Sequence, residues 1–305
     1  MKTAFIRVVE NQRLYGETYI TWFSGRDLLR GASPGRFLML RCADIAHSDV
    51  AASFSSPLAL SLAGGRGDLK DASTSLPAPP SGVGLASDPL LPRPMSYHRL
   101  REGPHGTEFS ILYQVVGRGT AWLAERRPGD AVFAWGPLGR GYSTRAGAQN
   151  LLLIAGGIGV APLVWLAEDA VARGRSVVLI AGARDARGVF PAALLPPEVE
   201  VVVTTEDGSA GRRGLATDAV SEYYDWADQV FACGPNPMFA ALSDVLRQRE
   251  GSQRVRGQKP VQALLESPMA CGTGICYGCA VLDRRDRPRL VCKDGPRFEL
   301  REAFS

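Results

Sequence analysis

Four cysteines near the C-terminal end of the chain have a spacing that is typical of a metal centre. Cys271, Cys276, Cys279 and Cys292 follow the pattern C-x4-C-x2-C-x12-C. A structural zinc site usually takes its ligands as two close pairs, but this segment holds only one C-x2-C pair and no histidine. A C-x4-C-x2-C run with a distant fourth cysteine is typical of a plant-type [2Fe–2S] cluster. We therefore predict such a cluster on these four thiolates, with zinc as the alternative.

Glycines accompany the cysteines and suit the same chemistry. Gly272, Gly274 and Gly278 let the backbone curl tightly, and they leave its N–H groups free to point at sulfur atoms. Two further cysteines, Cys42 and Cys233, lie far upstream and outside the pattern.

A second glycine-rich stretch, IAGGIGVAP (154–162), follows an apolar run and precedes a helical pattern. Gly156, Gly157 and Gly159 permit close backbone approach, and the start of the helix supplies N–H groups for a pyrophosphate. The stretch is not the strict G-x-G-x-x-G fingerprint, so a tight packing turn is the alternative. Its place after the first strand of a βα series favours nucleotide binding.

Three shorter motifs have both a chemical and a structural interpretation. In GRGTAWL (117–123), Gly119 and Thr120 can open a helix that faces a phosphate, or can form an ordinary helix cap. In RPMS (93–96), Arg93 can bind a phosphate and Ser96 can hydrogen-bond a flavin edge, or the arginine is a surface residue. In FACGP (231–235), Cys233 ends a sheet strand, where ligands bind, or is a buried structural cysteine.

The elements that must position these groups fall into two series. Before residue 150, short strands separated by polar turns predict a small antiparallel β-barrel; they span 4–10, 17–23, 36–42, 107–116 and 130–135. Residues 43–87 are rich in Ala, Ser, Gly, Pro and Leu and show no periodicity, so we expect a flexible insertion that carries no cofactor ligand.

From residue 150 the pattern alternates between apolar strands and helices. Strands are predicted at 150–157, 176–184, 199–207 and 229–234, with helices at 161–173 and 235–250. Alternating βα units predict a doubly wound parallel sheet. We expect three units: a β-barrel over 1–148, an α/β domain over 149–250, and a small cluster domain over 251–305.

The composition is that of an ordinary globular protein. The chain has 305 residues, 45% of them hydrophobic and 22% charged, and a net charge of only +4 with arginines spread along it. That distribution argues against nucleic acid as the partner. The N-terminus meets charges too early for a secretory signal, and no apolar run reaches the roughly 18–20 residues of a membrane span. We expect a cytoplasmic protein without a membrane anchor.

Taken in order, the motifs resemble those of one protein family. R-P-x-S, G-x-G-T, G-P-L-G (136–139), A-G-G-I-G-x-A-P, D-G-S (207–209), C-G-P, C-G-x-G-x-C-Y-x-C and V-C-x-D-G-P occur along the chain. This series resembles the electron-transfer subunits of two-component, NAD-linked dihydroorotate dehydrogenases, within the ferredoxin reductase superfamily. The similarity runs through nearly the whole chain except 43–87, where the family passes almost directly from strand to strand. It also departs at Pro92, where the family often has arginine.

The resemblance implies a set of cofactors and their residues. Arg93 to Ser96, with Pro94 and Met95 between them, would contact FAD, and Gly119 and Thr120 would lie at its pyrophosphate. Gly156, Gly157 and Gly159 would hold NAD. Cys233, the candidate catalytic residue, would lie with Gly234 beside the nicotinamide and the flavin, and the four clustered cysteines would ligate the [2Fe–2S] cluster.

The resemblance also implies a partner and a direction of electron flow. Dihydroorotate would be oxidised, in pyrimidine biosynthesis, on a separate FMN-containing catalytic subunit, with two copies of each subunit in a heterotetramer. Electrons would then pass through the cluster to FAD and on to NAD⁺. A flavin is needed because a nicotinamide exchanges two electrons together whereas a [2Fe–2S] cluster moves one at a time.

Two other functions stay open on the sequence alone. One is a reductase subunit that serves a ferredoxin, glutamate synthase-like, sulfite reductase or hydrogenase complex. The other is a redox sensor that uses the cluster as a switch, although a sensor leaves both glycine motifs unexplained.

Overall fold

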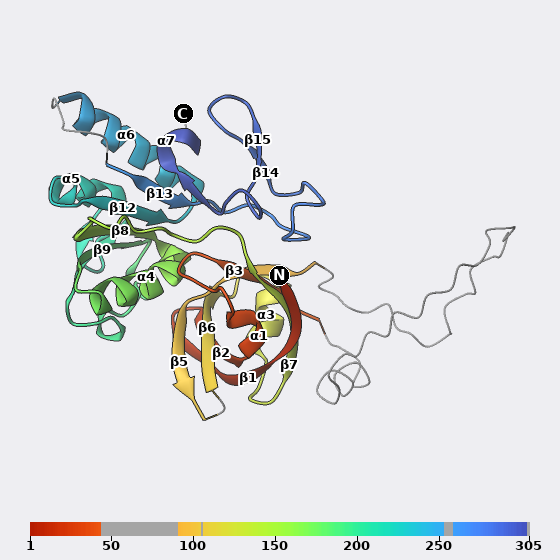
Figure 1. Ribbon diagram of the computed structural model, residues 1–305. Helices are drawn as coiled ribbons and strands as arrows, with labels where there is room; N and C mark the ends of the chain where they lie inside the picture. The colour runs from red at the N-terminus through yellow and green to blue at the C-terminus, as the bar shows by residue number, and fades with distance from the viewer. Residues whose placement is uncertain (44–90, 105, 253–258, 304–305) are drawn as a thin grey trace, which may run out of the picture.

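The computed structural model describes residues 1–43, 91–104, 106–252 and 259–303. From residue 44 onward, the insertion expected at 43–87 lies outside the described residues. Two seven-stranded sheets make up most of the structure, and a two-stranded hairpin, β14–β15, projects beside them (Figure 1).

The first sheet is antiparallel throughout and curls into a barrel (Figure 1). Its strands follow the order β4-β3-β7-β1-β2-β6-β5, and short helices α1 (Arg26–Leu29) and α3 (Arg118–Ala124) accompany it. The strands are β1 (Lys2–Tyr15), β2 (Thr18–Ser24), β3 (Phe37–Arg41), β4 (Arg93–Ser96), β5 (Arg99–Gly103), β6 (Gly106–Gln114) and β7 (Ala131–Leu138). Each strand predicted before residue 150 is confirmed.

The second sheet has the order β11-β10-β9-β8-β12-β13-β16, parallel except for β16. Its strands are β8 (Asn150–Gly156), β9 (Ser176–Ala183), β10 (Val199–Thr205), β11 (Arg212–Arg213), β12 (Gln229–Cys233), β13 (Val261–Leu264) and β16 (Arg297–Glu299). The helices are α4 (Val160–Ala172), α5 (Val220–Tyr223), α6 (Asn236–Ser252) and α7 (Leu300–Ala303), with 3₁₀ turns η1 (Gly157–Gly159), η2 (Ala186–Gly188), η3 (Ala192–Leu194) and η4 (Ala216–Ala219). The hairpin strands are β14 (Ala280–Leu282) and β15 (Pro288–Leu290).

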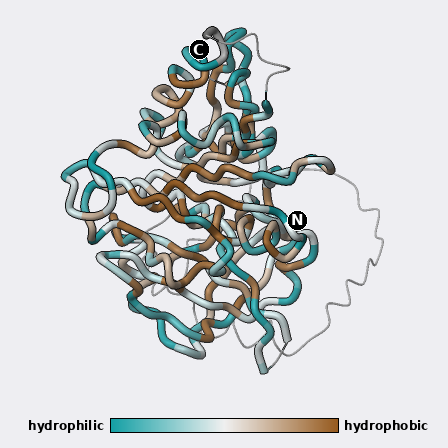
Figure 2. Tube along the Cα trace, turned by 90° about the vertical axis from the view of Figure 1, so that its left-hand side faces the viewer, coloured by the Kyte–Doolittle hydropathy of each residue, from teal (hydrophilic) through white to brown (hydrophobic). Residues whose placement is uncertain are grey.

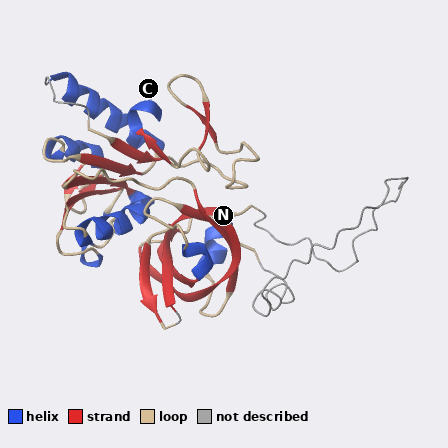
Figure 3. Cartoon of the chain, viewed as in Figure 1, coloured by secondary structure: helices blue, strands red, loops and turns tan. Residues whose placement is uncertain are grey.

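Helices cover both faces of the parallel sheet, which explains its continuous apolar strands (Figure 3). Alternate residues of β8 point to opposite faces: Leu151 and Leu153 pack in the cluster that contains α4, whereas Leu152 and Ile154 pack in the one that contains α6. Hydrophobic residues accordingly gather along the central strands, and hydrophilic ones lie on the surrounding loops (Figure 2). The predicted doubly wound sheet is confirmed.

The strands that flank the insertion are neighbours. β3 and β4 pair antiparallel, with Leu40 opposite Arg93, so the chain leaves and re-enters the barrel at one place. Loop-closure entropy changes slowly with length, and a short turn can join antiparallel neighbours. We expect that deleting residues 45–85 and joining the ends by a short turn leaves flavin content and NADH-driven dye reduction close to those of the full chain. A folded deletion variant that lacks flavin would contradict this expectation.

In the described part of the chain, no helix is long and apolar enough to cross a membrane.

Candidate functional site

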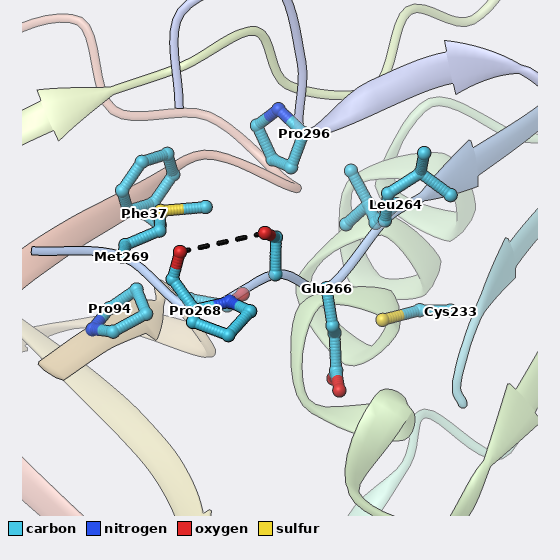
Figure 4. Close-up of a pocket in the computed structure, with 11 residues that line it drawn as sticks. Phe37, Pro94, Cys233, Leu264, Glu266, Pro268, Met269 and Pro296 are labelled. Atoms are coloured by element: carbon cyan, nitrogen blue, oxygen red, sulfur yellow. Dashed lines mark hydrogen bonds between the residues drawn. The ribbon is translucent and has the colours of Figure 1, made fainter. Parts of the chain in front are cut away.

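A cavity of ≈ 440 Å³ lies where the barrel meets the parallel sheet. Its walls come from both: Phe37, Pro94 and Ser96 belong to the barrel strands β3 and β4, and Cys233 ends β12. The other residues that line the cavity are those of the segment 264–269 and Pro296. Figure 4 shows Pro94 and Phe37 on one side of the cavity and Cys233 with Leu264 on the other. Three residues predicted from two separate motifs, Pro94, Ser96 and Cys233, thus share one cavity.

The RPMS strand divides its side chains between two environments. Pro94 and Ser96 face the cavity, whereas the side chain of Met95 is buried in the barrel core. This follows from the two-residue period of a strand. Any contact of Met95 with a cofactor is therefore left to its backbone.

Arg93 lies against the second glycine motif. A Cβ atom placed on Gly119 would come within 2.7 Å of Arg93 Nε, so only glycine lets the guanidinium sit this close to the start of α3. The Thr120 hydroxyl is already engaged there, since it accepts from the backbone N–H groups of Val116 (3.0 Å) and Gly117 (3.2 Å). Its side chain is thus a helix cap, and backbone N–H groups and Arg93 remain for a phosphate.

The three glycines after β8 have different surroundings. A Cβ on Gly156 would lie 2.8 Å from Met238 Sδ, and one on Gly159 would overlap the carbonyl oxygen of Cys233. Both are packing glycines that hold the loop against the end of β12. Gly157 differs because it has a φ of +54° and no atom lies within 4 Å of its Cβ position. Gly157 is the position that is open to a ligand.

Cys233 is a buried thiol at the cavity wall, 5% exposed. Burial, and secondarily the nearby Glu266 carboxyl, raise its pKa well above the ordinary value, so the thiol stays protonated at neutral pH. Gly234 follows it, and a Cβ there would meet Met238 and the Gly156 backbone. The C-G-P motif and the glycine loop are therefore packed directly on each other.

Glu266 is a cavity residue that the sequence analysis missed. Its side chain lines the cavity near Cys233 (Figure 4) and is exposed; its partial desolvation there raises the pKa of its carboxyl. A perturbed carboxyl in a cavity is a candidate functional group. No local pattern marks Glu266, because its role depends on the end of β13 lying next to β12.

The four clustered cysteines come together as two pairs. Cys271 is in hydrogen-bonding contact with Cys276, and Cys279 with Cys292. Cys276 is exposed, whereas Cys279 and Cys292 are each 2% exposed. The backbone N–H of Thr273 donates to Cys271 Sγ (3.3 Å), as predicted for this loop.

The arrangement fits two irons better than one ion. Among the described residues, no three Cys, His, Asp or Glu side chains are gathered around a single metal position. A [2Fe–2S] cluster takes two protein ligands on each of two irons, which is what two cysteine pairs provide. Burial and then Cys279 raise the pKa of Cys292 to about 12, whereas N–H donors from Thr273 and Cys276 outweigh burial and lower that of Cys271 to about 5. The two cysteine pairs thus fit the two irons of a [2Fe–2S] cluster.

Two of the three loop glycines have the backbone conformation that was expected. Gly272 and Gly274 have φ values of 70° and 85°, and a Cβ on Gly272 would lie 2.6 Å from Met39 of β3. Gly278 has no positive φ; the left-handed residue is instead Tyr277, with φ 58°. The left-handed conformation expected at Gly278 is thus adopted by Tyr277 instead.

The cluster loop is fastened to the barrel close to the cavity. Trp135 of β7 donates its indole N–H to the carbonyl oxygen of Cys271 (3.1 Å), and Met269, two residues earlier, lines the cavity. The G-P-L-G and D-G-P motifs also meet, because the Arg140 N–H donates to Gly295 O (2.6 Å). Sequence reasoning could not find Trp135, since its partner lies 136 residues away.

Asp185 follows the C-terminal end of β9. Its carboxylate pairs with Arg187 (2.7 Å) and accepts from the Arg187 backbone N–H (2.9 Å). The Arg187 side chain thereby lowers the pKa of Asp185, so the carboxylate is charged at neutral pH.

Comparisons with known proteins agree with this geometry. Residues 266–303 match the family model described as the iron-sulfur cluster binding domain of dihydroorotate dehydrogenase B. The dihydroorotate dehydrogenase B (NAD(+)) electron transfer subunit of Desulforamulus reducens is 32% identical over 287 residues, which cover 92% of this chain and 90% of the relative. The same subunit from Geobacillus thermodenitrificans is 38% identical over 226 residues, 72% of this chain and 82% of the relative.

Solved structures show the same fold. The NADH-dependent reduced ferredoxin-NADP oxidoreductase, studied for flavin-based electron bifurcation, superposes with a TM-score of 0.72 and 22% identity, covering 99% of this chain and 91% of that one. An Amycolatopsis cytochrome P450 reductase gives a TM-score of 0.56 at 20% identity, covering 86% and 69%. The level and extent of sequence identity decide the family: the chain belongs to the dihydroorotate dehydrogenase B electron transfer subunits.

Proposed function

We propose that this chain carries electrons between the catalytic subunit of an NAD-linked dihydroorotate dehydrogenase and NAD, by way of a [2Fe–2S] cluster and FAD. The observation that carries the proposal is that the cavity and the cysteine loop adjoin each other along the chain. Met269 lines the cavity at the junction of barrel and sheet, and the chain reaches the cluster cysteine Cys271 only two residues later. One route therefore joins the cavity to the cluster.

Each cofactor has residues suited to hold it. Arg93 and the backbone at Gly119 bind the FAD pyrophosphate, while Pro94 and Ser96 line the space for its ring system. The open backbone at Gly157 faces the NAD pyrophosphate. When bound, the flavin exchanges electrons with NAD as a hydride and with the cluster one at a time.

The residues around the ring site shape and shield it. Cys233 and Leu264 supply a wall of low polarity, and the Cys233 thiol remains neutral beside the reacting rings. Glu266 places a carboxyl with a raised pKa at the same wall, where it can exchange a proton with the ring edge. Asp185 can accept from a ribose hydroxyl, whereas Arg184 or its partner Arg187 can meet a 2′-phosphate; the relatives, which are named as NAD(+) subunits, support NAD.

We place the unit boundaries by sheet membership. The barrel, up to residue 148, binds FAD, and the parallel sheet binds NAD. The cluster-binding unit, predicted as 251–305, shares strands β13 and β16 with that sheet, and we propose that its cysteine-bearing segment is the part between these two strands. Cytoplasmic location stays a prediction.

Co-expression with an FMN-containing catalytic subunit of an NAD-linked dihydroorotate dehydrogenase tests the proposal. The purified complex should contain FAD and roughly two irons per chain, and should reduce NAD⁺ with dihydroorotate. A chain that reduces a dye with NADH but accepts no electrons from that subunit, and serves a ferredoxin instead, would contradict it.

The surface next to the cluster is where the catalytic subunit should dock. Ile275 and Tyr277 flank Cys276 and are 80% and 64% exposed. Electrons leave a cluster most readily where it is nearest the surface, and exposed apolar side chains of this size mark interfaces. We expect Ile275→Asp to weaken binding of the catalytic subunit about 10-fold or more, as measured by titration calorimetry.

NADH-driven dye reduction by the free chain should not change in Ile275→Asp. Leu215→Asp is the matched control, because Leu215 is also an exposed aliphatic side chain, 50% exposed, and lies between β11 and η4, away from the cysteine loop. Equal weakening of subunit binding by both changes would show that the effect is one of charge and not of this surface.

A further inference from the structure

The three residues that follow β4, Tyr97–Arg99, all contact one face of helix α4. Their partners on the helix are Ala161, Trp165 and Glu168. These positions are four and three residues apart, so they lie along one face of a helix with 3.6 residues per turn. β4 carries the FAD-contacting residues, and α4 starts directly after the glycine loop. The contacts of Tyr97–Arg99 with α4, here named the clasp, therefore join the two cofactor sites.

His98 makes the central contact of the clasp. It is fully buried, its Nδ1 lies 2.8 Å from Ala161 O, and its Nε2 has no hydrogen-bond partner among the described residues. Burial lowers its pKa to about 3, so the ring is neutral and carries one N–H. Since a carbonyl oxygen can only accept, that hydrogen is on Nδ1. The ring also packs edge-on against Phe190, with centroids 6.0 Å apart.

Arg99 and Tyr97 make the outer contacts. Arg99 Nε lies 2.7 Å from Glu168 Oε1, with side chains only 17% and 31% exposed, and its Nη2 donates to Leu194 O. Partial burial makes such a pair less screened than a surface pair. Tyr97 packs edge-on against Trp165 at 6.3 Å and donates its hydroxyl hydrogen to Leu28 O (2.6 Å) inside the barrel.

We propose that this clasp sets the distance between the FAD site and the NAD site and so controls hydride transfer between them. The proposal rests on the proposed function. The two walls of the cavity come from different sheets, so neither sheet alone fixes their separation. Hydride transfer needs the reacting atoms about 3–3.5 Å apart, and a misplacement of about 1 Å can cost about 100-fold in rate. From NADH, two electrons and one proton move as the hydride, and the second proton that the flavin gains comes from solvent by way of the Glu266 carboxyl at the cavity wall.

Glu168→Gln tests the clasp in the full chain loaded with FAD and cluster. The matched control is Asp169→Asn, since Asp169 is the next residue of α4 and pairs with Arg173 (2.9 Å) on the solvent side. We expect Glu168→Gln to lower the limiting rate of flavin reduction by NADH about 10-fold and to weaken the long-wavelength charge-transfer absorption. FAD content and NAD⁺ affinity should stay within about twofold of wild type, and Asp169→Asn should change none of these.

Hydrogen exchange gives a readout that does not depend on turnover. Peptides that cover residues 93–99 and 160–172 should exchange faster together in Glu168→Gln and not in Asp169→Asn, because the clasp restrains both. If exchange and flavin reduction are unchanged in Glu168→Gln, or if FAD is lost in parallel with rate, the clasp proposal is wrong.

A pair of changes at His98 separates positioning from packing. His98→Asn retains a side-chain N–H near the position of Nδ1, whereas His98→Leu retains apolar volume but removes the donor. We expect flavin reduction to be slower in His98→Leu than in His98→Asn; the opposite order would mean that His98 only fills space and would overturn the proposal. A wild-type chain that NADH does not reduce would refute the proposed function, and hydrogen exchange would still decide the clasp.

Discussion

Replacing Cys276 by serine should remove the iron–sulfur absorption and stop electron transfer to the catalytic subunit, while NADH still reduces the flavin. Cys276 is the exposed member of the cysteine pairs, so its loss leaves the buried pair Cys279 and Cys292 and the surrounding packing intact. Loss of a residue that only hydrogen-bonds a metal ligand typically costs about 10–100-fold in metal affinity, so loss of a ligand itself should cost at least about 100-fold. Hydride exchange with NAD does not use the cluster and should continue.

Iron analysis, visible absorption and stopped-flow reduction by NADH measure the three parts of this expectation. Cys42→Ala is the matched control, because Cys42 is a buried cysteine of the barrel outside the cluster pattern and should leave the iron content unchanged. Retention of two irons in Cys276→Ser would refute the ligand assignment, and loss of NADH-driven flavin reduction would refute the assigned order of the cofactors.

Gly157→Ala should weaken NADH binding about 10-fold or more while FAD stays bound. The new methyl group meets no protein atom within 4 Å, so it occupies only the space that the NAD pyrophosphate would approach. A left-handed backbone costs an alanine about 1–2 kcal/mol, so a modest loss of stability should accompany the change. Equilibrium titration with NADH and a melting curve measure the two effects.

Gly174→Ala separates strain from ligand contact. Gly174 also has a positive φ, +72°, and open space around its Cβ position, but it follows the far end of α4. It should lose a similar amount of stability and bind NADH normally. If both variants bind NADH equally well, Gly157 does not face the nucleotide.

Gly159→Val should behave differently from Gly157→Ala. A Cβ at this position overlaps the backbone of Cys233, so the substitution must push the glycine loop away from β12. We expect loss of both cofactors or failure to fold. The glycine motif gives no reason to distinguish Gly156, Gly157 and Gly159. Only the atoms packed around each position show that they differ.

The iron–sulfur cluster was predictable because the spacing of the cysteines proposed as its ligands is local. The spacing of four cysteines within 22 residues indicates an iron–sulfur cluster without reference to the rest of the chain. The same holds for the two sheets, since continuous apolar strands that alternate with amphipathic helices allow few arrangements, and the strand and helix predictions were confirmed.

The set of residues that line the cavity could not be predicted, because it depends on contacts between distant parts of the chain. Pro94 and Ser96 come from one sheet and Cys233 from another, and Glu266 joins them only because β13 lies beside β12. Met95 was grouped with its neighbours in the sequence, but the two-residue period of β4 turns its side chain into the barrel core.

The sequence by itself determined which cofactors this protein is built for, because each is recognised by a short run of residues whose spacing is set by backbone geometry. Only the tertiary structure decided how those sites face one another. Trp135 on Cys271, Glu266 beside Cys233 and His98 on Ala161 are contacts across 136, 33 and 63 positions. No local propensity encodes such pairs, since they arise when the barrel and the sheet bury their surfaces against each other.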